Sequence, residues 1–172
     1  MIVLVLGGAR SGKSAVAEAL AAERAGPVTY VATGVATDDD MAARIAAHRA
    51  RRPPAWATVE AASDLPAVLR RLPGTLLVDA LGTWVAARLD DLDVAALDAV
   101  SVALAARTGD TVVVSDEVGL GVHPSSEIGR RFRDVLGDLN QRVAALADEV
   151  LLVVAGRVLP LARFDASPPV EP

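Results

Sequence analysis

The sequence predicts an α/β domain built on a mostly parallel β-sheet. Short apolar runs of strand length alternate with stretches of helical periodicity, which is typical of strand–helix–strand units whose sheet is covered on both faces. Two final apolar runs, joined by Gly156-Arg157, predict an antiparallel hairpin at the C-terminal edge. The length of 172 residues fits a single domain. We expect residues 1–165 to form it and the Pro-rich residues 166–172 to be a flexible tail.

The apolar pattern predicts the strands and helices one by one, beginning with a strand and a helix at the start of the chain. Ile2–Leu6 is a continuous apolar run that ends in two glycines, which indicates a buried strand. The helix expected after it, Ser14–Arg24, places Val16, Leu20 and several alanines on one face. Further strands are expected at Val28–Thr33, Trp56–Val59, Leu76–Val78, Thr111–Ser115, Val150–Ala155 and Val158–Leu161. Further helices are expected at Asp38–Arg52, Asp64–Leu72, Gly82–Leu89, Val94–Arg107 and Ser126–Ala147.

Composition excludes several classes of protein. Hydrophobic residues make up 52% of the chain and charged residues 23%, which excludes an intrinsically disordered chain. The absence of cysteine excludes disulfides and thiolate metal sites. A net charge of −5 argues against a nucleic-acid partner. The longest apolar runs fall well short of the ~20 residues that span a bilayer, so we expect a cytoplasmic protein without a membrane span.

One glycine-rich segment carries a specific chemical prediction. It reads G-G-A-R-S-G-K-S and matches G-x-x-x-x-G-K-[ST] at every fixed position, between a predicted strand and a predicted helix. Glycines let the backbone wrap a phosphate, while successive N–H groups and the helix N-terminus favour an anion. In this pattern Lys13 reaches the β- and γ-phosphates and Ser14 ligates Mg²⁺. The sequence therefore predicts a nucleoside triphosphate site, a P-loop, at Gly7, Gly8, Ala9, Arg10, Ser11, Gly12, Lys13 and Ser14.

Two predicted strands end in carboxylates that could serve the Mg²⁺. Asp79 follows Leu76–Val78, and Asp116-Glu117 follows Thr111–Ser115. P-loop proteins use an acidic side chain at a strand end to hold the metal or its waters. A strand-end carboxylate can equally cap the next helix, so spacing alone leaves the choice between Asp79 and Asp116 open.

The predicted helix Asp38–Arg52 contains a histidine beside several arginines. Asp40, Arg44 and His48 step by four, so their side chains can touch. A helical histidine is most often a packing or surface residue, and clustered arginines are most often a solvated helix end. The alternative is a neutral imidazole that attacks phosphorus while the arginines hold phosphate. Spacing alone does not decide between these two interpretations of His48 and the arginines.

Together these motifs resemble the bifunctional adenosylcobinamide kinase/adenosylcobinamide-phosphate guanylyltransferase family of cobalamin biosynthesis. The resemblance runs from Val3 to about Leu161. Beyond the P-loop it is carried by Tyr30–Gly34 (YVATG), Asp38–Pro53 (DDDMAARIAAHRARRP), Trp56–Glu60 (WATVE), Leu77–Asp79, Glu117–Gly121 (EVGLG), Gly129–Asp134 (GRRFRD), Asn140–Arg142 (NQR) and Ala147–Gly156 (ADEVLLVVAG).

The resemblance implies a P-loop NTPase-type, RecA-like three-layer fold and two reactions. A kinase step would phosphorylate adenosylcobinamide with GTP or ATP, with Lys13 as a catalytic residue. A second step would pass GMP from GTP, through a covalent adduct on His48, to adenosylcobinamide phosphate and give adenosylcobinamide-GDP. The family also implies Mg²⁺, held by Ser14 and Asp79, and a homo-oligomer, a trimer. Further nucleotide contacts would fall at Ala32, Thr33, Gly34, Arg49, Ala50, Arg51, Arg52, Glu60 and Asp79.

The chain departs from the usual family pattern near the expected cobinamide side, at Ala87, Asp116 and Ser125-Ser126.

Two other functions are considered: a P-loop small-molecule kinase without nucleotidyl transfer, and a GTP-binding regulatory module. The sequence contains no N-K-x-D guanine signature, which argues against the regulatory module.

Overall fold

The computed structural model describes residues 1–34, 46, 52–61 and 64–163. The predicted helix Asp38–Arg52 lies almost wholly outside the described residues, and so does the predicted tail 166–172. Among the described helices, none is both long and apolar enough to cross a bilayer.

The described chain is organised around a seven-stranded sheet with the order β3-β2-β4-β5-β1-β6-β7. Every neighbouring pair runs parallel except β6 and β7, which run antiparallel. The predicted α/β class, with its mostly parallel sheet and antiparallel C-terminal edge, is confirmed. The strands are β1 (Ile2–Gly7), β2 (Val28–Ala32), β3 (Ala57–Glu60), β4 (Thr75–Asp79), β5 (Thr111–Asp116), β6 (Glu149–Val154) and β7 (Arg157–Pro160).

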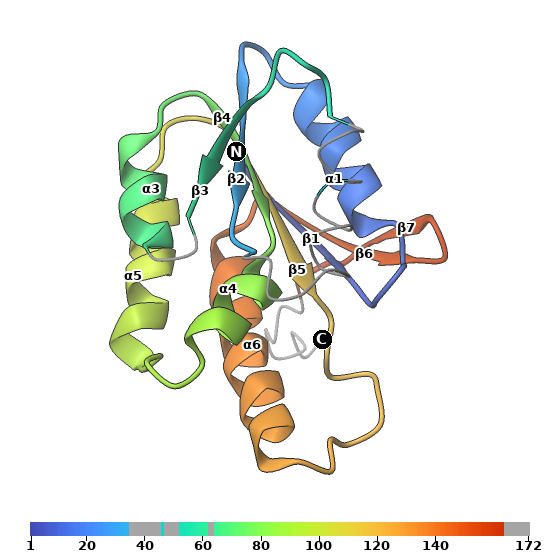
Figure 1. The fold of residues 1–172 in the computed structure, drawn as a ribbon. Coiled ribbons are helices and arrows are strands. Elements are labelled where there is room, and N and C mark those ends of the chain that lie inside the picture. The colour runs from blue at the N-terminus through green and yellow to red at the C-terminus, as the bar shows by residue number, and fades with distance from the viewer. Residues whose placement is uncertain (35–45, 47–51, 62–63, 164–172) are drawn as a thin grey trace, which may run out of the picture.

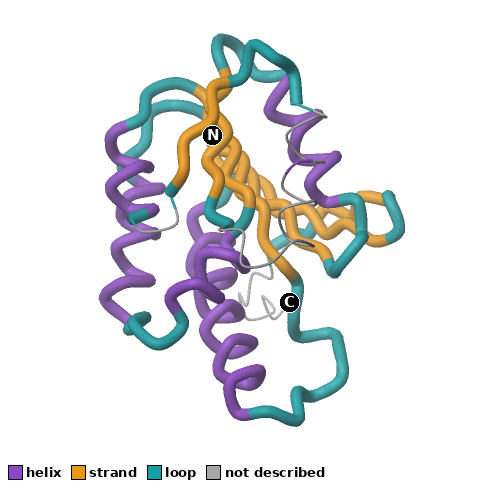
Figure 2. Tube along the Cα trace, viewed as in Figure 1, coloured by secondary structure: helices purple, strands orange, loops and turns teal. Residues whose placement is uncertain are grey.

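Helices cover both faces of this sheet (Figures 1 and 2). On one face lies α1, and on the other lie α3 to α6. The apolar residues of the strands alternate between the two cores: Leu4, Val78 and Val113 pack toward α3–α6, whereas Val5 and Val114 pack toward α1. This two-sided burial explains why the strands read as continuous apolar runs. The helices are α1 (Lys13–Ala22), α3 (Leu65–Arg71), α4 (Leu81–Arg88), α5 (Val94–Ala105) and α6 (Glu127–Leu146).

Capping side chains mark the starts of α3, α5 and α6. The Asp64 side chain accepts from Ala67 N at 3.0 Å, and the Asp93 side chain accepts from Ala96 N at 2.8 Å. Ser126, one of the positions where the chain departs from the family, accepts from Gly129 N at 3.2 Å. Each side chain satisfies an amide that the first helical turn leaves unpaired.

The hairpin turn falls one residue earlier than predicted. The turn residues are Ala155 and Gly156, both with positive φ (50° and 73°), and Arg157 already pairs with Val154 as part of β7. Two consecutive positive φ angles give a turn whose twist matches that of the flanking strands. The predicted turn, Gly156-Arg157, was wrong by one residue, because Ala155 adopts the left-handed conformation and Arg157 pairs in β7.

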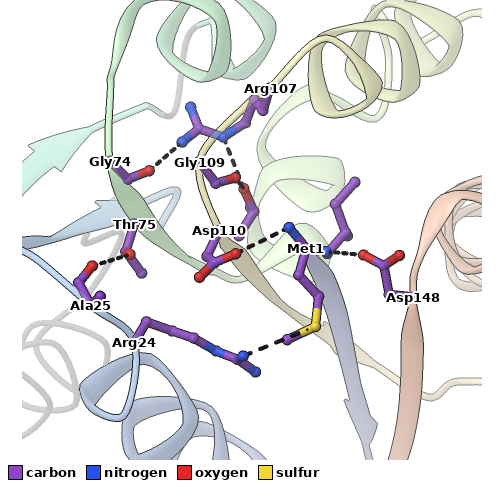
Figure 3. A network of polar contacts seen from close by, with 11 residues as sticks. Met1, Arg24, Ala25, Gly74, Thr75, Arg107, Gly109, Asp110 and Asp148 are labelled. Carbon is purple, nitrogen blue, oxygen red and sulfur yellow. Dashed lines mark hydrogen bonds and ion pairs between the residues drawn. The ribbon is translucent and has the colours of Figure 1, made fainter.

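The amino ends of the central strands are joined by a polar network (Figure 3). The Met1 ammonium group donates to Asp110 Oδ1 at 3.0 Å, and Ile2 N donates to Asp148 Oδ2 at 2.6 Å. Arg107 donates to Leu69 O, Leu72 O and Gly74 O at 2.6–2.7 Å, and to Thr111 Oγ1 at 2.8 Å. Partial burial lowers the pKa of Arg107 without removing its charge. These contacts fix the end of the sheet opposite the P-loop.

The Arg107 contacts give a prediction about stability. Replacing Arg107 with lysine removes the planar fork and leaves loop carbonyls without a donor, so the free energy of unfolding should fall by about 3 kcal/mol. Urea denaturation measures this change. The matched control is Arg71→Lys on the exposed side of α3, which should change the free energy of unfolding by less than about 0.5 kcal/mol. Equal effects of the two substitutions would contradict the role assigned to Arg107.

Candidate active site

The strand register brings the candidate residues to the carboxyl edge of the sheet. Ala32, at the end of β2, pairs with Glu60 of β3 on one side and with Asp79 of β4 on the other. Gly7, at the end of β1, pairs with Asp116 of β5. Parallel strands end at the same edge, so segments that are far apart in the sequence meet there. Open α/β sheets bind ligands at this edge.

The P-loop connects β1 directly to α1. Gly12 has φ +97°, a left-handed conformation that costs a residue with a Cβ atom free energy, and helix α1 begins at Lys13. Gly156 N, in the β6–β7 turn, donates to Ser11 O at 2.8 Å, and Ser11 Oγ accepts from Lys13 N at 3.3 Å. The hairpin at the sheet edge therefore supports the loop from outside.

Lys13 lies over the loop that precedes it. Its Nζ donates to Gly8 O at 3.2 Å and is 2.7 Å from Asp116 Oδ1. Between Gly8 and α1 the loop exposes Ala9 and Arg10, and Ser14 in the first turn of α1 is partly buried. The structure therefore pairs the lysine with the carboxylate of β5, the strand that the resemblance did not favour for the metal.

Asp79 has different partners. The Tyr30 hydroxyl donates to Asp79 Oδ2 at 2.7 Å, and the Arg52 guanidinium carbon lies 3.2 Å from the centroid of the Tyr30 ring. Burial raises the pKa of the Tyr30 phenol well above its usual range, and the Asp79 charge adds to the shift. Tyr30 therefore remains a hydrogen-bond donor and orients the carboxylate, while the cation stacks on its ring.

The segment after β2 is fixed to the start of α4. Thr33 is fully buried, and its Oγ1 donates to Ala80 O at 2.6 Å and lies 2.6 Å from Thr83 Oγ1. A Cβ atom on Gly34 would lie 3.8 Å from the Thr83 side chain. Ala32, Thr33 and Gly34, predicted as nucleotide contacts, thus lie beside Asp79 at the same edge.

Helix α6 fixes the end of β5. Asn140 Oδ1 accepts from Ser115 Oγ at 2.6 Å, and Asn140 Nδ2 donates to Asp116 O at 3.0 Å. The Glu117 carboxylate accepts from Gly119 N and Leu120 N at 2.7 and 3.0 Å, so it closes the loop that follows. These two side chains position Asp116.

The described part of the chain brings together most of the predicted site. The carboxyl edge holds Gly7–Ser14, Ala32–Gly34, Glu60 and Asp79, and Glu60 is exposed there. Arg52 lies nearby, with its guanidinium over the Tyr30 ring. His48, Arg49, Ala50 and Arg51 lie outside the described residues. Sequence reasoning did not select Tyr30, Thr83 or Asn140. Tyr30 and Asn140 fall in the YVATG and NQR motifs, but nothing in those motifs indicates which atoms their side chains contact.

The donor set suits Mg²⁺. Ser14, Asp79 and Asp116 offer hydroxyl and carboxylate oxygens, which are the ligands of hard cations. Within the described ranges no cluster of at least three His, Asp or Glu side chains forms a metal cage. Mg²⁺ bound by one or two protein oxygens together with substrate phosphates needs no such cage. The residues present fit a metal that arrives with a nucleotide.

The fold and this edge define a P-loop nucleotide-binding protein. A solved structure described as a prototypical ATPase from the type III secretion system of pathogenic bacteria has the same fold, with a TM-score of 0.57 and 9% identity. The match covers 88% of this chain and half of that ATPase chain. It supports the RecA-like architecture and nothing finer.

The particular family follows from sequence. Residues 3–161 match the cobinamide kinase / cobinamide phosphate guanyltransferase family. The chain is 45% identical to the bifunctional adenosylcobalamin biosynthesis protein CobP of Pseudomonas aeruginosa, over 92% of this chain and 95% of the relative. It is 39% identical to the bifunctional protein CobU of Salmonella typhimurium, over 91% and 97%.

The chain belongs to this family and is a bifunctional cobinamide kinase and guanylyltransferase of cobalamin biosynthesis. The predicted resemblance is confirmed. A kinase without nucleotidyl transfer and a regulatory GTP-binding module are both set aside, because the match covers nearly the whole chain.

The loop geometry predicts a contrast between two glycines. Gly12→Ala would place a Cβ atom on a residue with φ +97° and 3.4 Å from Gly156 Cα, whereas a Cβ atom on Gly8 meets nothing within 4 Å. We expect Gly12→Ala to weaken GTP binding by about tenfold or more, because left-handed strain of ~1–2 kcal/mol displaces the loop amides. Gly8→Ala should bind within about twofold of the unmodified protein, as its backbone needs no left-handed angle. Equilibrium titration with GTP measures both, and equal losses would contradict this account of the loop.

Proposed function

We propose that the enzyme phosphorylates adenosylcobinamide with GTP or ATP at the P-loop. It then transfers GMP from GTP, through a covalent adduct on His48, to give adenosylcobinamide-GDP. One observation carries the proposal. The segment that contains His48 follows β2, whose last residue Ala32 pairs with Asp79. At its other end the Arg52 guanidinium stacks on the ring of Tyr30, whose hydroxyl donates to Asp79. His48 is four residues from Arg52, a separation that spans at most ~14 Å.

In the kinase step the chain mainly binds and orients. The loop amides and Lys13 would hold the β- and γ-phosphates, so that the cobinamide hydroxyl meets the γ-phosphorus in line with the leaving oxygen. The hydroxyl oxygen forms a bond to phosphorus, the bond to the β-phosphate oxygen breaks, and the nucleoside diphosphate departs. Lys13 stabilises the charge that develops on the phosphate oxygens.

The guanylyl step needs a nucleophile that an amide cannot replace. A neutral imidazole nitrogen of His48 would attack the α-phosphorus of GTP and displace pyrophosphate. The substrate phosphate oxygen then attacks the same phosphorus and releases the imidazole. Arg49, Arg51 and Arg52 would hold the phosphates between the two attacks, and the Arg52–Tyr30 stack supports this assignment at the described end of the segment.

Mg²⁺ is part of the proposal. It would arrive with the nucleotide and neutralise phosphate charge, and the Ser14 hydroxyl and the Asp79 carboxylate would hold it or its waters. Tyr30 supports the role of Asp79, because its hydrogen bond engages Oδ2 and orients the other oxygen.

A homo-oligomer is also proposed, a trimer by family resemblance, in the cytoplasm where the nucleotides are available. The exposed apolar side chains at the β6–β7 edge support association: Val154 is 58% exposed, Val158 46% and Leu159 57%. A sheet edge with apolar side chains and unpaired backbone groups favours contact with another chain.

Asp79→Asn tests the metal assignment. The amide keeps the shape of the side chain and its contact with Tyr30 but loses the charge, so the Mg²⁺ concentration that gives half-maximal kinase activity should rise about tenfold or more. Affinity for GTP itself should change less. Steady-state rates over a Mg²⁺ series measure the shift. A larger shift in Asp116→Asn would assign the metal to β5 instead.

His48→Asn should separate the two activities. Label from α-³²P-GTP should no longer stay on the protein, because the lone pair of an amide nitrogen is delocalised. Kinase activity should persist, since it needs the loop, the metal and an oriented hydroxyl. In the unmodified enzyme the adduct should be acid-labile and base-stable, and γ-³²P-GTP should leave no label. An adduct that survives in His48→Asn would place the nucleophile elsewhere, with Lys13, the only lysine in the chain, examined first.

A further inference from the structure

Asp116 has no part in either step proposed above, although it is paired with Lys13. Lys13 Nζ lies 2.7 Å from Asp116 Oδ1, with the two side chains 14% and 33% exposed. The pair is therefore partly removed from water, where charge interactions are screened less than at an open surface. The Asp116 carboxylate therefore lies directly beside the lysine that would bind the phosphates.

The carboxylate is fixed beside the loop. Asp116 pairs with Gly7 in the strand register, and its carbonyl oxygen accepts from Asn140 Nδ2 at 3.0 Å. Glu117 N donates to Gly7 O at 3.1 Å, which ties β5 to the start of the loop. The side chain fills the space above Gly82 in α4, since a Cβ atom there would collide with Asp116 Oδ2. These contacts hold Asp116 close to Lys13.

A nucleotide entering this site meets two opposing charges. Its phosphates gain the Lys13 ammonium group but also approach the Asp116 carboxylate, a like charge that the pair had neutralised. Free GTP carries its full negative charge into this contact. GTP complexed with Mg²⁺ brings two compensating positive charges, which relieve the repulsion from Asp116.

We propose that Asp116 is a specificity-determining residue that makes the P-loop select the Mg²⁺ complex of the nucleotide over the free nucleotide. The carboxylate raises the cost of binding free nucleotide and leaves binding of the complex little changed. The inference rests on the proposed function, because it takes Lys13 as the phosphate ligand and Mg²⁺ as the metal.

The test is a binding measurement without turnover. The probe is α,β-methylene-GTP, whose α–β bond cannot be cleaved, titrated by calorimetry in EDTA and in Mg²⁺. Asp116→Asn should lower the dissociation constant in EDTA by about tenfold, because a like charge is removed from a partly buried site. In Mg²⁺ the dissociation constant should change by less than about threefold, since the metal already offsets that charge. The matched control, Asp90→Asn, removes a side chain that is 91% exposed and should change neither constant.

A second variant displaces the carboxylate without removing its charge. Gly82→Ala forces Asp116 to rotate away from Lys13, so it should also tighten binding in EDTA. Because the chain has one lysine, protein labelled with ¹⁵N-lysine gives a single side-chain Nζ resonance. That resonance should move in both variants before any nucleotide is added.

The proposal is overturned if Asp116→Asn binds the probe in EDTA no more tightly than the unmodified protein does. It is also overturned if binding tightens equally in EDTA and in Mg²⁺. Lys13→Ala separates this failure from failure of the proposed function. If Lys13→Ala weakens binding in both buffers while Asp116→Asn has no effect, only the inference fails. If Lys13→Ala binds the probe normally, the assignment of the P-loop fails as well.

Discussion

The backbone turn between β1 and α1 is the constraint on which the rest of the site depends. To wrap a phosphate, the chain must leave a buried strand, adopt a left-handed angle at Gly12 and enter a helix at the next residue. Such a turn is stable only where other elements hold it. Here the β6–β7 turn binds Ser11 O, and the end of β5 binds Gly7 O. The antiparallel hairpin, which adds β6 and β7 to the sheet beyond β1, thus also stabilises the P-loop.

Two carboxylates lie at the carboxyl edge of the sheet, one at the end of β4 and one at the end of β5. Asp79 of β4 is engaged by a phenol with a cation on its ring, and Asp116 of β5 is engaged by the loop lysine. Among the described contacts, Asp79 accepts from the neutral Tyr30 phenol, whereas Asp116 is paired with the Lys13 ammonium group, which offsets its charge. This difference supports the different roles proposed for the two aspartates.

The topology explains how one nucleotide fold can support two transfers. The loop on β1 would bind the terminal phosphates, and the connection from β2 to β3 begins after Ala32, which pairs with Asp79 of β4. The nucleophile proposed on that connection, His48, would approach a nucleotide from a different strand than the P-loop does. The same fold occurs in a secretion ATPase at 9% identity, so the fold alone does not assign the activity.

The sequence by itself determined the order and type of the elements, because strands buried on both faces and helices with one apolar face leave periodic patterns that need no knowledge of contacts. It also determined the P-loop, because its glycines, Lys13 and Ser14 lie within one short segment whose pattern can be found without knowledge of distant contacts. Only the tertiary structure decided that Lys13 pairs with Asp116, that Tyr30 holds Asp79, and that Asn140 fixes the end of β5. These contacts join residues 24 or more positions apart. Their partners are set by strand order, β4-β5-β1, which local spacing does not encode.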